Sequence, residues 1–102
     1  MNRSDTIEAD EALRQALAQP TLASRLLAET ARQLARYRPH HPLHPTAWGA
    51  ALARGVHHTL DGLPEVIQNR ATAAAVTALP AARPGETAGE YAIRLHAAAR
   101  TV

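Results

Sequence analysis

The chain has 102 residues, no cysteine and a formal net charge of +2 at neutral pH. This length is typical of one domain, and the lack of cysteine excludes disulfides, thiolate metal sites and cysteine nucleophiles. No apolar run is long enough to span a bilayer, and the first ten residues include three acids but no hydrophobic block. The sequence therefore predicts a single cytoplasmic domain, residues 1–102, without a signal peptide or a membrane partner.

All eleven basic residues are arginine, and alanine fills 24 positions. GC-rich codons encode both residues, so this composition indicates a high-GC bacterial gene rather than selection of arginine for phosphate binding. The charge is nonetheless uneven along the chain. Residues 20–58 hold five arginines, a single acid and five of the six histidines, a balance of +4, whereas residues 1–19 carry −2. The basic middle segment predicts an anionic partner.

Apolar residues recur at helical spacing through almost the whole chain, which predicts an all-α protein of about five short helices in a compact bundle or orthogonal array. The first expected helix covers about residues 5–19, where Asp5 and Glu8 resemble a capping box and Pro20 ends the segment. Its apolar stripe consists of Ala9, Ala12, Leu13, Ala16 and Leu17. With no phenylalanine the core is thin, so a homodimer is one candidate assembly.

The second expected helix begins after Thr21, its predicted N-cap, and ends before Pro39. One side of this helix is apolar and the other is charged. The charged side carries Arg25, Glu29, Arg32 and Arg36. Because Glu29 can pair with only some of these arginines, the pattern leaves positive charge for a partner.

A connector rich in proline and histidine follows at about residues 38–45. Proline removes a backbone donor and disfavours helical geometry in the residue before it, so no regular helix crosses this segment. The cationic and imidazole side chains of the connector are Arg38, His40, His41 and His44. Tyr37 and Trp48 flank it, and aromatic residues with arginine are enriched at binding hot spots, although Trp48 belongs to an apolar stripe and is expected in the core.

Three helices are expected after the connector. Thr46 is the predicted N-cap of the third, which ends at Asp61-Gly62 before Pro64. The fourth covers about residues 65–79 and is weakly amphipathic because alanine lies on every side. The last begins at the capping box of Thr87 and Glu90.

Neither a metal site nor a catalytic site is predicted. His40 and His44 have a spacing that chelates metals on a helix, but Pro42 between them prevents the helical turn. His58 and Asp61 are three residues apart on the third helix, and His57 is adjacent. We interpret them as a surface pairing near a helix C-terminus. The sequence predicts no cofactor and no small-molecule substrate, and hence a non-catalytic protein.

DNA binding through the same basic middle segment, with or without a helix-turn-helix unit, is the alternative hypothesis. The third and fourth helices, at about residues 47–79, have roughly the length and turn glycine of a helix-turn-helix. Residue types that contact bases or phosphates occur at Arg54, Gln68, Asn69 and Arg70. Against this alternative, His58 falls where that motif requires a small residue.

We therefore expect a small regulatory or adaptor protein that binds a macromolecule, either another protein or a second copy of itself, through a basic surface. The residues predicted to form this surface are Arg25, Arg32, Arg36, Arg38, His40, His41 and His44.

Overall fold

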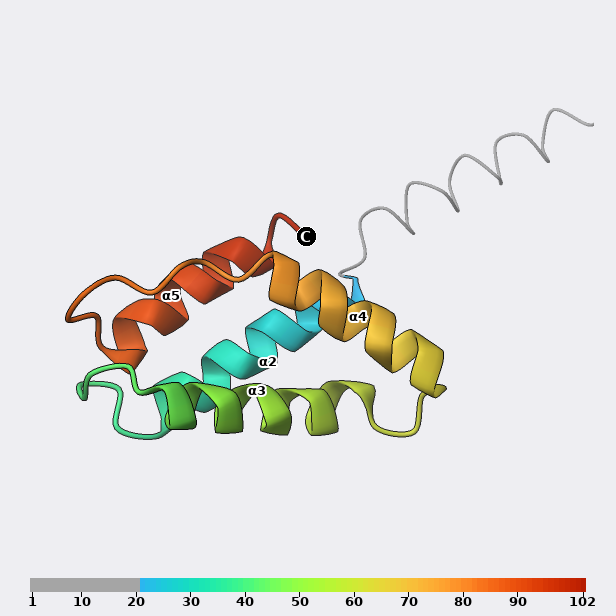
Figure 1. Ribbon diagram of the computed structural model, residues 1–102, viewed down its shortest axis with the longest axis horizontal. Helices are drawn as coiled ribbons and strands as arrows, with labels where there is room; N and C mark the ends of the chain where they lie inside the picture. The colour runs from blue at the N-terminus through green and yellow to red at the C-terminus, as the bar shows by residue number, and fades with distance from the viewer. Residues whose placement is uncertain (1–20) are drawn as a thin grey trace, which may run out of the picture.

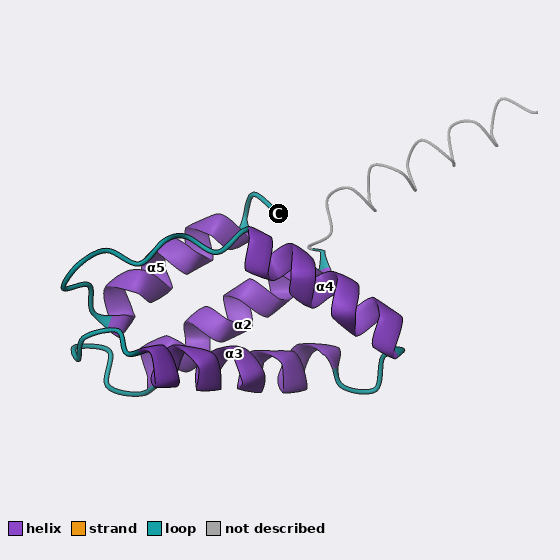
Figure 2. Cartoon of the chain, viewed as in Figure 1, coloured by secondary structure: helices purple, strands orange, loops and turns teal. Residues whose placement is uncertain are grey.

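The computed structural model describes residues 21–102, which form four helices (Figure 1). Their bounds are α2 Leu22–Arg36, α3 Pro45–Leu60, α4 Glu65–Thr77 and α5 Ala88–Ala99. All regular structure in this part of the chain is helical, apart from an isolated bridge between Pro42 and Thr87 (Figure 2). The predicted all-α class is confirmed. The expected first helix, about residues 5–19, lies outside the described residues, so four of the five expected helices are observed.

Two of the predicted N-caps are present. The Thr21 side chain accepts a hydrogen bond of 3.0 Å from the Ser24 amide at the start of α2. At the start of α5 the Thr87 hydroxyl accepts from the Glu90 amide at 3.1 Å, and the Glu90 carboxylate accepts from the Thr87 amide at 3.2 Å. These reciprocal bonds satisfy amide groups that have no partner inside the helix.

The predicted start of α3 is wrong by about two residues. The N-cap is His44, whose Nδ1 accepts a hydrogen bond of 3.2 Å from the Thr46 amide, and the helix begins at Pro45. Proline suits this first position because its fixed φ is helical and its missing N–H would have no partner there. His44 is therefore held at a helix start rather than free in a loop. At the other end of α3, Gly62 adopts a φ of +83° in the turn, as the glycine there predicts.

Helix α2 lies at the centre of the fold and contacts α3, α4 and α5. Its buried face consists of Ala23, Leu26, Leu27, Thr30, Ala31, Gln33 and Leu34. Buried side chains of α5, chiefly Tyr91 and Leu95, pack in the same core. Because the buried face of α2 contacts three helices, its few leucines supply much of the core in a chain that contains many alanines.

Gly55 brings α2 and α3 close together. A Cβ atom added to Gly55 would lie 2.7 Å from the Oγ1 atom of Thr30 and 3.3 Å from the Cδ1 atom of Leu26. Thr30 is fully buried, and its hydroxyl donates to the Leu26 carbonyl at 2.8 Å. The absence of a side chain at Gly55 therefore permits a close approach between the middle of α2 and the second half of α3.

Candidate binding site

A cleft of about 580 Å³ lies where the end of α2, the connector and α3 meet. Part of its lining is apolar and consists of Leu34, Pro42, Ala47 and Ala88, of which Leu34 and Ala88 are buried. The polar, aromatic and basic side chains that line it are Gln33, Arg36, Tyr37, Arg38, His41, His44 and Arg54. The volume falls in the range typical of ligand pockets in proteins, so the cleft has room for several side chains of a partner.

The walls of the cleft are positively charged. Arg36, Arg38 and Arg54 line it together with His41 and His44, and none of the described residues in the lining is acidic. Guanidinium groups stay charged at every physiological pH and present several donors in a plane, a geometry that suits carboxylates and phosphates. The cleft is therefore suited to an anionic group carried on an apolar body.

A chain of hydrogen bonds holds Arg54 in place. Its Nε atom donates to Oε1 of Gln33 at 3.1 Å, and the Gln33 amide donates to Oε1 of Glu29 at 3.0 Å. Glu29 also accepts from Nε of Arg32 at 2.9 Å. Hydrogen bonds from Gln33 and Arg32 lower the pKa of the Glu29 carboxyl. Because Gln33 is buried, this relay fixes the Arg54 stem while its remaining donors can face a ligand.

Tyr37 forms an exposed aromatic surface at the rim of the cleft, with 58% of its surface accessible. The guanidinium carbon of Arg54 lies 5.2 Å from the centre of the Tyr37 ring, and that of Arg36 lies 5.9 Å from it. Both distances lie within the range of cation–π attraction. Tyr37 therefore gathers two arginines whose Cα atoms belong to different helices.

Arg38 has a backbone φ of +48°, the left-handed region that non-glycine residues seldom adopt. It follows Tyr37 directly and begins the turn of the connector, where the His41 amide donates to the Arg38 carbonyl at 3.1 Å. A residue with a side chain in this region typically costs about 1 kcal/mol relative to glycine. The fold nevertheless places an arginine, which lines the cleft, at this position.

The structure divides the sequence-predicted surface residues into two groups. Arg36, Arg38, His41 and His44 line one cleft, whereas Arg25, Arg32 and His40 do not. The Arg32 guanidinium is occupied by an ion pair with Glu29.

Arg54 also lines the cleft, although the sequence suggested it for the DNA-binding alternative. Sequence reasoning missed Gln33, for which the available signal was a polar residue on the buried face of α2.

The other residues suggested for nucleic acid lie on α4, away from this cleft. Asn69 and Arg70 are exposed near the start of that helix. The Gln68 side chain donates to the Leu63 carbonyl at 2.8 Å, so its amide group supports the turn between α3 and α4. Helices α3 and α4 each contact α2 more extensively than they contact each other.

A second cavity, about 380 Å³, lies on the other side of the connector. It is lined by Leu43, Pro45, Trp48, Leu79, Pro80, Ala82 and Tyr91, and the described lining contains no charged side chain. Trp48 is partly buried, since it packs against the core and also lines this cavity. The sequence predicts Trp48 in the core, and the structure places it at the edge of the core, where it is partly buried.

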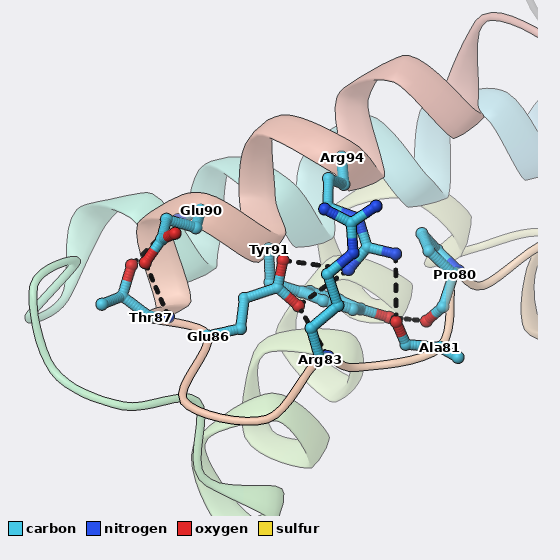
Figure 3. A network of polar contacts seen from close by, with 8 residues as sticks. All are labelled: Pro80, Ala81, Arg83, Glu86, Thr87, Glu90, Tyr91 and Arg94. Carbon is cyan, nitrogen blue, oxygen red and sulfur yellow. Dashed lines mark hydrogen bonds and ion pairs between the residues drawn. The ribbon is translucent and has the colours of Figure 1, made fainter.

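A polar network holds the loop that forms one wall of the second cavity (Figure 3). The Tyr91 hydroxyl donates to the Pro80 carbonyl at 2.8 Å, and Arg94 donates to the Ala81 carbonyl at 3.0 Å. Two further bonds, of 2.8 and 2.9 Å, join the Arg94 guanidinium to the nearly buried Glu86 carboxylate. The Glu86 carbonyl in turn accepts from the Leu43 amide at 2.8 Å, which connects the loop to the connector.

This network predicts a loss of stability in acid. Burial alone would raise the pKa of the Glu86 carboxyl, but hydrogen bonds from the Arg94 guanidinium and the Arg83 amide outweigh it, and the pKa is lowered. A lowered pKa in the folded state stabilises the fold above the unfolded value of about 4.3, and this contribution disappears as pH falls through the folded value. We expect the free energy of unfolding to fall between about pH 6 and pH 3, and to fall less in Glu86→Gln.

Urea unfolding at several pH values measures this difference. Glu65→Gln, at an exposed position at the start of α4, is the matched control and should keep the wild-type pH dependence. Equal slopes for the wild type and Glu86→Gln would contradict the assigned role of Glu86.

The histidines show no convergence toward a metal. Within residues 21–102 no group of three or more His, Cys, Asp or Glu side chains could hold a metal ion. His57 and His58 are exposed, with their ring centres 5.7 Å apart, and neither they nor Asp61 line the cavities described above. No helix in the same range is both long enough and apolar enough to cross a membrane.

The site must be interpreted from its own geometry. Comparisons with protein-family models, with curated proteins and with solved structures found no match to this chain.

Proposed function

We propose that this chain is a non-catalytic regulatory or adaptor protein that binds an acidic segment of a protein partner in the basic cleft. The observation that carries the proposal is the gathering of Arg36, Arg38 and Arg54 with His41 and His44 around one cleft whose described lining contains no acid. Carboxylates of the partner would replace water as the acceptors for the free guanidinium donors.

The shape of the site favours a peptide segment over a nucleic-acid duplex. A duplex presents its phosphates on a broad convex surface, which an extended band of exposed arginines or a protruding helix contacts best. Here the arginines line a hollow together with apolar side chains, which suits side chains that enter it one at a time. The exposed Tyr37 ring adds a rigid aromatic contact of the kind enriched at protein interfaces.

Binding of a fluorescein-labelled oligoglutamate peptide, followed by fluorescence polarisation, tests the proposal. We expect binding at about 50 mM salt that weakens at about 200 mM, because the contacts are electrostatic. The variant Arg36→Gln/Arg38→Gln should bind at least about 10-fold more weakly, since it removes two charge-assisted contacts.

A matched variant, Arg70→Gln/Arg100→Gln, has the same net charge but alters exposed residues outside the cleft. It should bind within about 2-fold of the wild type, because only long-range screened charge is lost. Equal weakening by both double variants would show that net charge rather than the cleft governs binding, and no binding at the lower salt would refute the proposal.

The DNA-binding alternative makes a different prediction. A labelled duplex should show no mobility shift with the wild type at about 50 mM salt if the cleft is a peptide site. A shift that disappears in Asn69→Ala/Arg70→Ala would instead assign the function to α4.

A further inference from the structure

We infer that the partner segment is bipartite: its carboxylates enter the basic cleft, while one large apolar side chain of the same segment fills the cavity on the other side of the connector. This inference rests on the proposed function and names the chemistry of the segment that the site would select. The two cavities differ in charge, since five basic side chains line the first and the described lining of the second has no charged side chain.

The connector itself separates the two cavities. Pro42 and His44 line the basic cleft, whereas Leu43 and Pro45 line the apolar cavity. His44, just before the start of α3, has an extended backbone with φ −109° and ψ 135°, and in such a backbone successive side chains point to opposite sides. Residues 42–45 therefore contribute to both cavities in turn, and a single ligand that crosses the connector can reach both.

The loop beyond the apolar cavity is held in place before any ligand arrives. Tyr91 and Arg94 bind the carbonyl groups of Pro80 and Ala81, and the Leu43 amide donates to the Glu86 carbonyl on the same side. A preformed wall reduces the ordering that a ligand must impose on its site. The cavity, about 380 Å³, is large enough for one bulky side chain, and Trp48 and Tyr91 offer aromatic contacts within it.

The charge of the basic cleft selects the kind of occupant. A wholly apolar ligand would fill the second cavity but leave the adjacent arginines without counterions, whereas a purely acidic ligand would leave the apolar cavity to water. A segment that carries both groups satisfies both sites in one binding event, with the second contact made at high effective concentration.

Two series of labelled peptides test this inference with the full chain. Each peptide of the first series carries a run of glutamate and one leucine, placed about two to six residues away, which spans about 7–20 Å when extended. The second series has alanine in place of the leucine. At the best spacing we expect the leucine peptide to bind at least about 10-fold more tightly than its alanine counterpart, because burial of a leucine side chain is worth this much.

Two exposed alanines provide a matched pair of variants. Ala82 lines the apolar cavity, whereas its neighbour Ala81 does not. Ala82→Phe should fill the cavity and remove the preference for leucine, with unchanged binding of the alanine peptide. Ala81→Phe adds the same side chain outside the cavity and should retain the preference.

The outcomes separate the two proposals. If both series bind equally and Arg36→Gln/Arg38→Gln weakens both, the basic cleft functions but the bipartite inference is wrong. The inference also fails if Ala81→Phe and Ala82→Phe reduce the preference equally. If neither series binds the wild type, the proposed function fails together with the inference drawn from it.

Discussion

Replacing Leu26 with alanine is expected to lower the free energy of unfolding by about 3–5 kcal/mol. Leu26 is fully buried in α2, and its Cδ1 atom would lie 3.3 Å from a Cβ atom on Gly55, so it fills the contact between α2 and α3. Truncation removes its apolar area from the core and leaves a cavity that rigid helix backbones cannot fill. Since domains of this size are stable by only about 5–15 kcal/mol, the loss is a large share of the total.

Urea unfolding followed by circular dichroism measures this loss. Leu52→Ala provides the comparison, because Leu52 lies on α3 and is only partly buried against the same core. Truncation of Leu52 should lower the free energy of unfolding by about half as much or less, because folding buries less of the apolar surface of Leu52 than of Leu26. A loss at Leu26 no larger than the loss at Leu52 would contradict the central position of α2.

Two glycines of α3 are expected to respond in opposite directions to the same substitution. Gly49→Ala should raise the free energy of unfolding by about 0.5–1 kcal/mol, because alanine favours the helix and nothing lies within 4 Å of the added Cβ atom. Gly55→Ala gains the same helical preference but places its Cβ atom 2.7 Å from Thr30 Oγ1. Overpacking of this kind typically costs about 1–3 kcal/mol, so Gly55→Ala should destabilise.

The same unfolding experiment compares the two glycine variants. A double variant with Thr30→Ala tests the origin of the clash, because it removes the Oγ1 atom that the Cβ atom added at Gly55 would meet. Destabilisation by Gly55→Ala should then become smaller. If both glycine variants instead stabilise the protein equally, α2 and α3 do not approach each other as closely at Gly55 as described.

Helical periodicity and local capping signals were sufficient to predict most of the fold. The helical spacing of apolar residues locates α2, α3 and α5, because amphipathic helices carry their burial pattern in the sequence. Helix α4 is only weakly amphipathic, and Pro64 and Pro80 mark its limits instead. Thr87 and Glu90 fixed the start of α5, since a capping box is a local interaction between residues three apart. The start of α3 was predicted incorrectly because proline at the first helical position and a histidine cap compete with the more common threonine cap.

The candidate site could be predicted only in part. The charge count indicates a basic middle segment, and four of the residues that it points to, Arg36, Arg38, His41 and His44, line the cleft. The inclusion of Arg54 depends on the packing of α3 against α2, a contact between residues far apart in sequence. The apolar cavity depends in the same way on the loop near Ala82, which Tyr91 and Arg94 hold. Such tertiary pairings leave no periodic signal in one sequence.

The prolines of the connector limit how any partner can be recognised. Pro42 and Pro45 have no amide hydrogen, and the amide of Leu43 already donates to Glu86. An incoming strand would thus find few main-chain donors along residues 42–45, and a continuous ladder of the kind used in strand addition cannot form there. Selectivity must then come from side chains, so a few substitutions around the connector could redirect this scaffold toward other sequences without altering its backbone pairing.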